Sequence, residues 1–451
     1  MAPPAPRALG LLACTALVVG NMVGSGVFLL PASLAAFGPI AVAGWLVTSL
    51  GSIALALVFG RLATQVPKTG GPYAYTREAF GDFAGFLVAW GYWITLWAGN
   101  AGVAVAFAGY VGFFAPAVGA TPLLGLLVAL AAIWVLTLVN IRGVGAAGAV
   151  QIVTTALKLL PLLAIAILGL AWIEPAHYRP VNVSPLSWPA AVAATAALTL
   201  WAFLGLESAT VPAGEVDRPA TTIPRATVLG TSFAAVLYVL VTIVVMGLLP
   251  NDALRGSTAP LADAAGLIWG GLGGALVAAG AVVSTFGTLN GFTLLAGQVP
   301  YAAAQDGVFP RAFARRSRRG TPAFALIVSN LLASLLVAMS FSRGLVDAFT
   351  FIILLATLAA LVPYLLCAAA DLMLLIRAPD RVPAGAMPRL ATIAAVAFVY
   401  AFGAIYGAGQ EVVFWGFLLL LAGVPFYLAI QWQNRTPSVA RATVSATVVV
   451  D

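Results

Sequence analysis

The chain consists of long apolar runs separated by short polar connections. A helix needs about 20 apolar residues to cross the roughly 30 Å hydrocarbon core of a bilayer, and twelve runs reach that length. The apolar residues follow one another without alternation, which favours helices over the strands of a membrane β-barrel. The predicted spans are residues 9–30, 40–62, 82–114, 123–140, 146–172, 189–213, 226–249, 266–298, 323–341, 345–376, 388–408 and 411–432.

The amino-acid composition excludes the water-soluble classes of protein. Of the 451 residues, 62% are hydrophobic and only 8% are charged, whereas an ordinary soluble domain has about 25% charged residues. A soluble enzyme, a nucleic-acid-binding protein and a disordered chain are therefore excluded. The net charge of +7 comes from short basic clusters between apolar runs, which is typical of a protein embedded in a lipid bilayer.

The basic residues also predict an orientation. If the N-terminus is cytoplasmic and the spans alternate, only Arg179, Arg255 and Arg343 fall outside, and Lys158 falls within a span. All the other Lys and Arg residues, of 21 in total, then lie inside. This positive-inside bias predicts a multi-pass protein with both termini in the cytoplasm, and it supports an even number of spans.

Two spans are interrupted by glycine at matching places. The first span contains Gly20–Gly26 and the sixth contains Trp201–Ser208. Each opens a set of five spans, and because five is odd the second set enters the membrane from the opposite side. Such a pair of interrupted helices points to a transporter site at the membrane midplane. The alternative is that these glycines are small-residue contacts between packed helices.

This pattern predicts one transmembrane transporter domain over residues 1–433. Its inverted repeats would cover about 8–173 and 189–376, with two extra helices at 388–432. Residues 434–451 would form a disordered cytoplasmic tail. Where the first span unwinds, free N–H groups at Gly24, Ser25 and Gly26 could bind a carboxylate. Carbonyl groups at 203–205 could receive an ammonium group.

Four motifs carry a family resemblance. They are the Gly-Ser-Gly-Val-Phe-Leu-Leu-Pro run at 24–31, Gly-Gly-Pro-Tyr-Ala-Tyr at 70–75, Gly-Leu-Glu-Ser at 205–208, and Leu-Leu-Ala-Gly-Gln at 294–298 followed by Asp-Gly-Val-Phe-Pro at 306–310. Together they resemble the amino acid–polyamine–organocation transporter superfamily, and most of all its bacterial arginine/agmatine antiporter group. The resemblance implies an all-α fold of twelve spans with a five-plus-five inverted repeat, alternating access, and an inner-membrane location. Members of that group are often dimeric, so a homodimer is also expected.

Three ionisable residues stay within the spans, where a charge is costly and usually functional. Glu207 could bind a proton or a cationic ligand, and the resemblance gives it a gating role. Lys158 could carry a proton, or it could be a fixed ammonium group that ties spans one and eight through carbonyl groups. Its presence argues against sodium coupling and departs from the arginine/agmatine group. Asp371 is expected to form a local ion pair with Arg377 or a helix cap.

The resemblance also assigns side chains to a pocket. Trp201 would cover the substrate, Asn100 and Phe292 would form the walls, and Tyr92, Glu207 and Tyr364 would form an inner gate. A tryptophan is expected where Phe292 stands and a serine where Ala356 stands, so the substrate would be shorter or less cationic than arginine. The predicted substrate contacts are Met22, Gly24, Ser25, Gly26, Leu96, Asn100, Trp201, Phe203, Leu204, Phe292 and Ala356, and the predicted gating or proton-coupling residues are Tyr92, Lys158, Glu207 and Tyr364.

The predicted function is secondary active transport, most of all the exchange of a cationic amino acid for its amine. One alternative is a proton-coupled symporter of broader or neutral specificity that uses Lys158. Another is a receptor or structural subunit that binds amino acids without moving them. An enzyme is not expected, because the only histidine, His177, lies in an outside loop and no nucleophile–base pair occurs in the spans. No metal or cofactor site is predicted, and the lack of a Walker motif excludes an ATP-driven pump.

Overall fold

The computed structural model describes residues 9–66, 71–142, 158–210, 216–379 and 385–433. Within these ranges the regular elements are all helices, apart from one bridge between Leu9 and Val216. The predicted tail at 434–451 and the first part of the predicted fifth span, 146–157, lie outside the described residues. The all-helical class predicted from the apolar pattern is thus confirmed.

Eleven helices in the described ranges are long and apolar enough to cross a membrane. A shorter apolar helix, Lys158–Trp172, covers the second half of the predicted fifth span. Besides the two interrupted helices, the crossing helices are α3 (Ala41–Gln65), α5 (Asp82–Phe114), α7 (Pro122–Arg142), α10 (Pro219–Leu248), α12 (Pro260–Gln305), α13 (Ala323–Ser340), α14 (Leu345–Arg377), α15 (Met387–Gly407) and α16 (Gln410–Leu421), whose apolar stretch continues to Gln433. Near its start α12 is kinked at Gly270, which has φ +70°.

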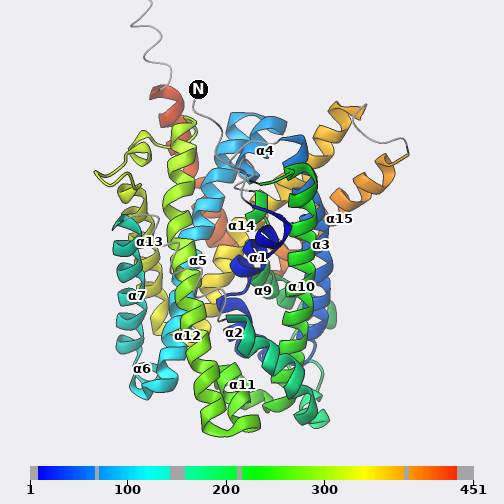
Figure 1. Cartoon of the computed structure of the whole chain (residues 1–451), viewed down its shortest axis with the longest axis vertical. Coiled ribbons are helices and arrows are strands. Elements are labelled where there is room, and N and C mark those ends of the chain that lie inside the picture. Colours follow the sequence, from blue (N-terminus) through cyan, green and yellow to red (C-terminus); the bar gives the residue numbers. More distant parts are fainter. Residues whose placement is uncertain (1–8, 67–70, 143–157, 211–215, 380–384, 434–451) are drawn as a thin grey trace, which may run out of the picture.

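Shorter helices cap the two ends of the bundle. α4 (Pro72–Phe80) and the end of the last helix lie at one end, while α6 (Pro116–Ala120) and α11 (Asn251–Gly256) lie at the other (Figure 1). The connections predicted to be cytoplasmic thus lie at one end of the bundle, and those predicted to be outside lie at the other end. Which end faces the cytoplasm stays a prediction from the charge distribution.

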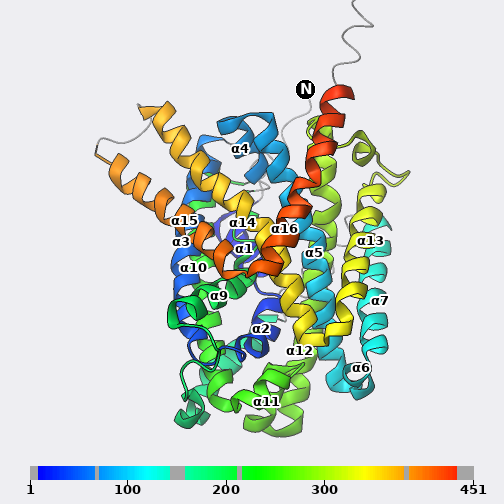
Figure 2. The same ribbon diagram turned by 180° about the vertical axis from the view of Figure 1, so that it is seen from behind.

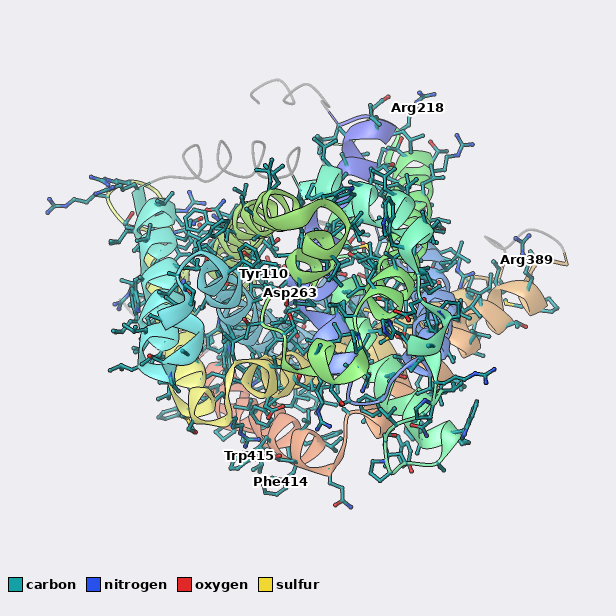
Figure 3. All side chains as sticks on the ribbon, turned by 90° about the horizontal axis from the view of Figure 1, so that it is seen from below. Tyr110, Arg218, Asp263, Arg389, Phe414 and Trp415 are labelled. Carbon is teal, nitrogen blue, oxygen red and sulfur yellow. The ribbon has the colours of Figure 1, made fainter. Side chains whose placement is uncertain are left out.

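The centre of the bundle is formed by α5 and α14, which pack on each other and on neighbouring helices (Figure 2). In the most apolar stretch of α5, 89% of the residues are buried, compared with 22% in α15. α15 leans away from the bundle and leaves Val399 and Phe402 exposed (Figure 2). Phe414 and Trp415 of α16 likewise lie on the outer surface in the view along the bundle (Figure 3). Such exposed apolar side chains are expected where a helix faces lipid.

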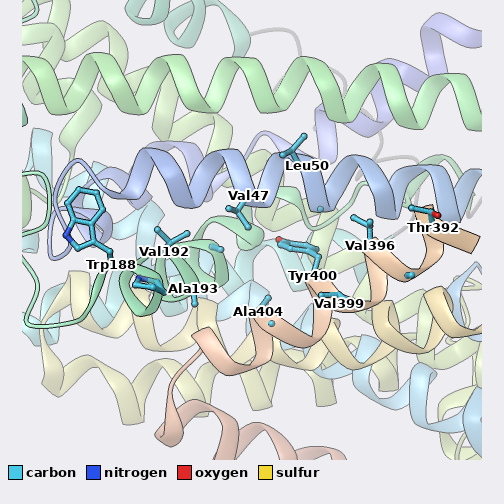
Figure 4. Close-up of a pocket in the computed structure, with 15 residues that line it drawn as sticks. Val47, Leu50, Trp188, Val192, Ala193, Thr392, Val396, Val399, Tyr400 and Ala404 are labelled. Carbon is cyan, nitrogen blue, oxygen red and sulfur yellow. The ribbon is translucent and has the colours of Figure 1, made fainter. Parts of the chain in front are cut away.

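An apolar groove of about 900 Å³ opens on this outer surface between α3, α9 (Trp188–Leu200) and α15 (Figure 4). Val47, Val192 and Val399 are among the residues that line it. The groove borders α9, the first part of the second interrupted helix, but no residue of either interruption lines it.

The first interrupted helix is resolved into α1 (Leu11–Met22) and α2 (Ser25–Leu34). Val23 and Gly24 between them have non-helical backbone angles. A Cβ atom on Gly24 would lie 2.7 Å from Cγ2 of Thr288, so only glycine fits at this close approach. The predicted break therefore exists, and it is held tightly against α12.

The second interrupted helix changes geometry at the predicted place. α9 is followed by single 3₁₀ turns, η3 (Trp201–Phe203) and η4 (Ser208–Thr210), with Gly205 between them at φ +102°. This backbone angle is readily available only to glycine. The last part of the predicted span, 211–213, lies outside the described residues.

Candidate functional site

The two helix interruptions lie against each other in the interior. Trp201 donates a hydrogen bond from Nε1 to Oγ of Ser25 at 3.2 Å. Asn21 donates from Nδ2 to Oγ of Ser208 at 2.8 Å. A Cβ atom on Gly26 would meet Cβ of Ala202 at 2.8 Å, so the two backbones touch. The glycines that open the helices also allow this close approach.

The start of α2 offers a site for an anion. The first N–H groups of a helix have no acceptor within the helix, and no side chain caps α2 at Gly24. The helix dipole adds partial positive charge at this end. Ser25 and Gly26 are buried, so a carboxylate bound here would be shielded from water.

In the turn after α9, two of the backbone carbonyl groups already accept hydrogen bonds from N–H groups of the same turn. The carbonyl oxygen of Phe203 accepts from the N–H of Leu206 at 3.2 Å, and that of Gly205 accepts from the N–H of Ser208 at 2.9 Å. The Phe203 ring packs against Trp45 and Tyr238, with ring centroids 6.0 and 5.5 Å away. Its side chain thus belongs to the packing between helices, and any contact of this residue with a substrate would come from its backbone.

Glu207 is the buried charge at the second interruption. Its side chain is 1% exposed. Tyr92 donates a hydrogen bond to Oε1 at 2.6 Å and Tyr364 donates to Oε2 at 2.7 Å. In the part of the chain that the structure describes, no Lys, Arg or His pairs with this carboxylate. It is therefore able to attract a cationic group.

A cavity of about 20 Å³ lies beside Glu207. This volume is close to that of one water molecule, so binding of an amino acid requires the surrounding helices to move apart. Of the predicted residues, Tyr92, Leu96, Leu204, Gly205, Glu207, Phe292 and Tyr364 line the cavity, and the lining residues that were not predicted as contacts are Asn21, Thr95, Ser208 and Leu295.

The remaining predicted contacts do not line this cavity. Trp201 packs beside Phe292, with ring centroids 6.0 Å apart. Gly99 makes room for both rings, because a Cβ atom there would lie 2.7 Å from Phe292 and 3.1 Å from Trp201. Met22, Asn100 and Ala356 are buried. Gly99 was missed because one glycine in an apolar helix gives no signal by itself.

The Lys158 ammonium group reaches the first interrupted helix. The side chain is 1% exposed and donates a hydrogen bond to the carbonyl oxygen of Gly20, in the last turn of α1. The carbonyl end of a helix carries partial negative charge, which suits an ammonium group. The geometry matches the predicted tie to span one, while no described contact reaches span eight.

The prediction for Asp371 was wrong about its partner. Asp371 forms a two-point ion pair with Arg61 of α3, in which Nε lies 3.2 Å from Oδ1 and the second contact joins Nη2 and Oδ2. Arg377 instead donates to the carbonyl oxygen of Glu78 at 3.5 Å. Sequence proximity misled here, because α14 packs against α3 and presents Asp371 to that helix.

At the end of the bundle that holds α4, Tyr73 donates a hydrogen bond to Asp306, the residue after α12. Burial and this hydrogen bond raise the pKa of Tyr73 above its usual value. The phenol therefore stays protonated at neutral pH. Elsewhere among the described residues, no group of three or more His, Cys, Asp or Glu side chains could hold a metal ion.

Comparison with known proteins agrees with this geometry. The sequence model of the family described as amino acid permease matches residues 9–429. A candidate arginine/ornithine antiporter of Bacillus subtilis is 36% identical over 82% of this chain and 84% of its own length. The cadaverine/lysine antiporter of Escherichia coli is 36% identical over 72% of each chain. The putrescine transporter PotE of Escherichia coli is 31% identical over 93% of this chain and 95% of its own length.

These matches cover almost all the crossing helices, including both interrupted ones, and they confirm the superfamily resemblance drawn from the four motifs. The chain therefore belongs to the amino acid permease family, whose members are multi-pass membrane transporters and not enzymes.

Proposed function

We propose that this protein is an antiporter of the bacterial inner membrane that exchanges a cationic amino acid for its amine by alternating access. The observation that carries the proposal is Glu207, a buried carboxylate with no basic partner among the described residues, at an interruption that packs against the uncapped start of α2. The Glu207 carboxylate suits a cation, and the N–H groups at the start of α2 suit a carboxylate. An amino acid with a cationic side chain presents both groups, while its amine presents only the cation.

The aromatic walls favour the same class of substrate. Trp201 and Phe292 could place their rings over an organic cation once the cavity opens, which adds cation–π attraction. An exchange of the arginine/agmatine type fits this arrangement. However, Phe292 and Ala356 stand where that group has tryptophan and serine, and we therefore propose a preference for shorter cations. The relatives named for ornithine, lysine, cadaverine and putrescine support this direction.

Three further features belong to the proposal. Both termini would lie in the cytoplasm, on the strength of the basic residues in the connections. The two five-span sets would form an inverted repeat around the two interruptions. A homodimer would follow from the resemblance to antiporters that are often dimeric.

The test is counterflow in proteoliposomes of the purified protein. Vesicles are loaded with arginine, agmatine, lysine, ornithine, putrescine or a neutral amino acid, and entry of labelled arginine and ornithine is followed. We expect entry only when the vesicles hold a cationic partner. Labelled substrate that is bound but never enters under any loading would instead indicate a receptor, and entry into empty vesicles would contradict obligatory exchange.

Trp201→Leu tests the site within that assay. Since Trp201 bonds Ser25 and packs beside Phe292, we expect the variant to lose exchange while its expression stays normal. Trp415→Leu is the matched control, because Trp415 is 48% exposed on the outer surface. Normal flux in Trp201→Leu would remove Trp201 from the site.

A second candidate, proton-coupled uptake, is favoured by one observation. Lys158 is a buried ammonium group with a single described hydrogen bond, so it could release and rebind a proton. Lys158→Gln keeps an N–H donor for Gly20 but has no charge. For an exchanger we expect counterflow within about threefold of wild type, which is the scale of one weakened hydrogen bond. Wild-type uptake driven by a proton gradient, and lost in Lys158→Gln, would favour the symporter.

A further inference from the structure

A second carboxamide lies against Asn100 in the interior. Asn100 donates from Nδ2 to Oδ1 of Asn330 at 2.8 Å and to Oγ1 of Thr293 at 3.2 Å. The three residues come from α5, α13 and α12, and the side chains are 0% exposed. Two neighbouring helices thus hold the nitrogen of one asparagine.

The oxygen of the same carboxamide is left over. Oδ1 of Asn100 is buried and has no hydrogen-bond partner within the described ranges. When one hydrogen bond joins two carboxamides, the oxygen of the donating carboxamide stays unused, as do the other N–H groups. Here the unused oxygen belongs to Asn100, and Nδ2 of Asn330 likewise has no partner within the described ranges. A buried acceptor of this kind calls for an explanation, because nearly all such groups in proteins find a donor.

Asn100 lies on α5 one helical turn beyond the residues that line the cavity beside Glu207. Leu96, one helical turn earlier on the same face of α5, lines that cavity. Gly99, the residue just before Asn100, packs against the rings of Phe292 and Trp201. Asn100 therefore follows the glycine that packs against both rings, and a substrate amine that enters between these rings would approach this turn of α5.

We infer that Asn330 and Thr293 are positioning residues that turn the carboxamide of Asn100 so that its oxygen accepts an N–H group from the cationic end of the substrate. The inference deepens the proposed function and rests on it. Asn330 acts through Asn100 and does not touch the substrate. The arrangement favours substrates that end in an ammonium or guanidinium group over apolar side chains of equal length.

The first experiment measures selectivity. Exchange of labelled lysine is followed, and norleucine, which has the same chain length without the distal ammonium group, is added as a competitor. Asn330→Leu should raise the KM for lysine about tenfold, as expected when an oriented hydrogen bond to a charged group is lost. The inhibition constant of norleucine and the maximal rate of lysine exchange should change less than threefold. Equal weakening for lysine and norleucine would overturn the inference.

Two further variants separate orientation from packing. Asn330→Asp keeps an acceptor oxygen for Nδ2 of Asn100, so the KM for lysine should return to within about threefold of wild type. Ser329→Ala is the matched control on α13. Its hydroxyl bonds the carbonyl oxygen of Ala296 at 2.9 Å and the Trp93 indole at 2.7 Å, without touching Asn100. This control should leave the lysine-to-norleucine ratio unchanged.

A double-mutant cycle tests the route of the effect. If Asn330 works only through Asn100, adding Asn330→Leu to Asn100→Ala should raise the KM no further. Additive losses would show an independent role and overturn the inference. Should Asn330→Leu fail to insert, Thr293→Val removes the other acceptor with little change in shape and should raise the lysine KM about threefold. No change there would equally overturn it.

Failure of the inference and failure of the proposed function give different results. A wild-type protein that exchanges no cationic amino acid or diamine contradicts the proposed function itself. A wild-type protein that exchanges lysine, with an unchanged lysine-to-norleucine ratio in Asn330→Leu, contradicts only the role of Asn330.

Discussion

Glu207 and Asp371 are both buried carboxylates inside crossing helices, yet their surroundings differ completely. Asp371 faces the guanidinium group of Arg61 in a two-point ion pair. Glu207 faces the hydroxyl groups of Tyr92 and Tyr364 and lies beside a cavity. The first charge is neutralised by a partner of the same strength, so it has little left to offer a ligand. The second is held in place by hydrogen bonds without an ionic partner among the described residues, which leaves it available to a cation.

Breaking the ion pair should give the largest loss of stability. Asp371→Ala leaves Arg61 without its ionic partner near the membrane interior. Removing one member of a fully buried pair destabilises by about 3–5 kcal/mol. Because the Arg61 side chain is 18% exposed, we expect a smaller loss of about 2–4 kcal/mol. Thermal unfolding of the purified protein in detergent measures this loss.

The same pair has an internal control. Arg61→Met combined with Asp371→Leu replaces both charges by apolar groups, which is often neutral for a buried pair. The double variant should regain most of the stability and should exchange substrate at a rate near that of wild type. A double variant that stays folded but transports nothing would place this ion pair in the mechanism and end the contrast with Glu207.

Glu207→Gln should have the opposite effect, with little loss of stability and a large loss of exchange. Its carboxamide can still accept from one phenol and donate to the other, so stability should change by less than about 1 kcal/mol. Without the charge, exchange of a cationic substrate should fall by about 10- to 100-fold, the scale of a hydrogen bond to a charged group. Counterflow and unfolding are measured on the same preparation. A large loss of stability with normal exchange per folded molecule would reverse the roles of the two carboxylates.

Asp306 offers a third, milder case, because it is exposed and accepts a hydrogen bond from Tyr73. Tyr73→Phe should reduce stability by about 0.5–1.5 kcal/mol. The raised pKa of Tyr73 means that this contribution is complete below its ordinary pKa of about 10 and is lost only as pH rises through the higher value of the folded protein. The difference from wild type should therefore be equal at about pH 5.5 and about pH 8. A difference that changes between these two pH values would contradict the raised pKa.

The interrupted helices show how much of the site could be predicted. The glycines at 24, 26 and 205 marked both breaks in the sequence, because a pair of spans interrupted by glycine at matching places is typical of a transporter site. The family resemblance grouped Tyr92, Glu207 and Tyr364, and the structure brings these three together. It could not show that the Phe203 ring would pack between helices against Trp45 and Tyr238. Which face of a helix meets which neighbour depends on its rotation, and an apolar run gives little sign of that rotation.

The sequence by itself determined the helical class, the approximate spans, the two interruptions and the expected charge asymmetry across the membrane. These features depend on the length and continuity of apolar runs, on glycine and on loop charge, all of which are local. Only the tertiary structure decided that Asp371 pairs with Arg61, that Lys158 reaches Gly20, and that Asn330 holds Asn100. The paired residues lie 310, 138 and 230 positions apart in the chain. Such contacts follow from how packed helices place their side chains, and sequence spacing does not encode that placement.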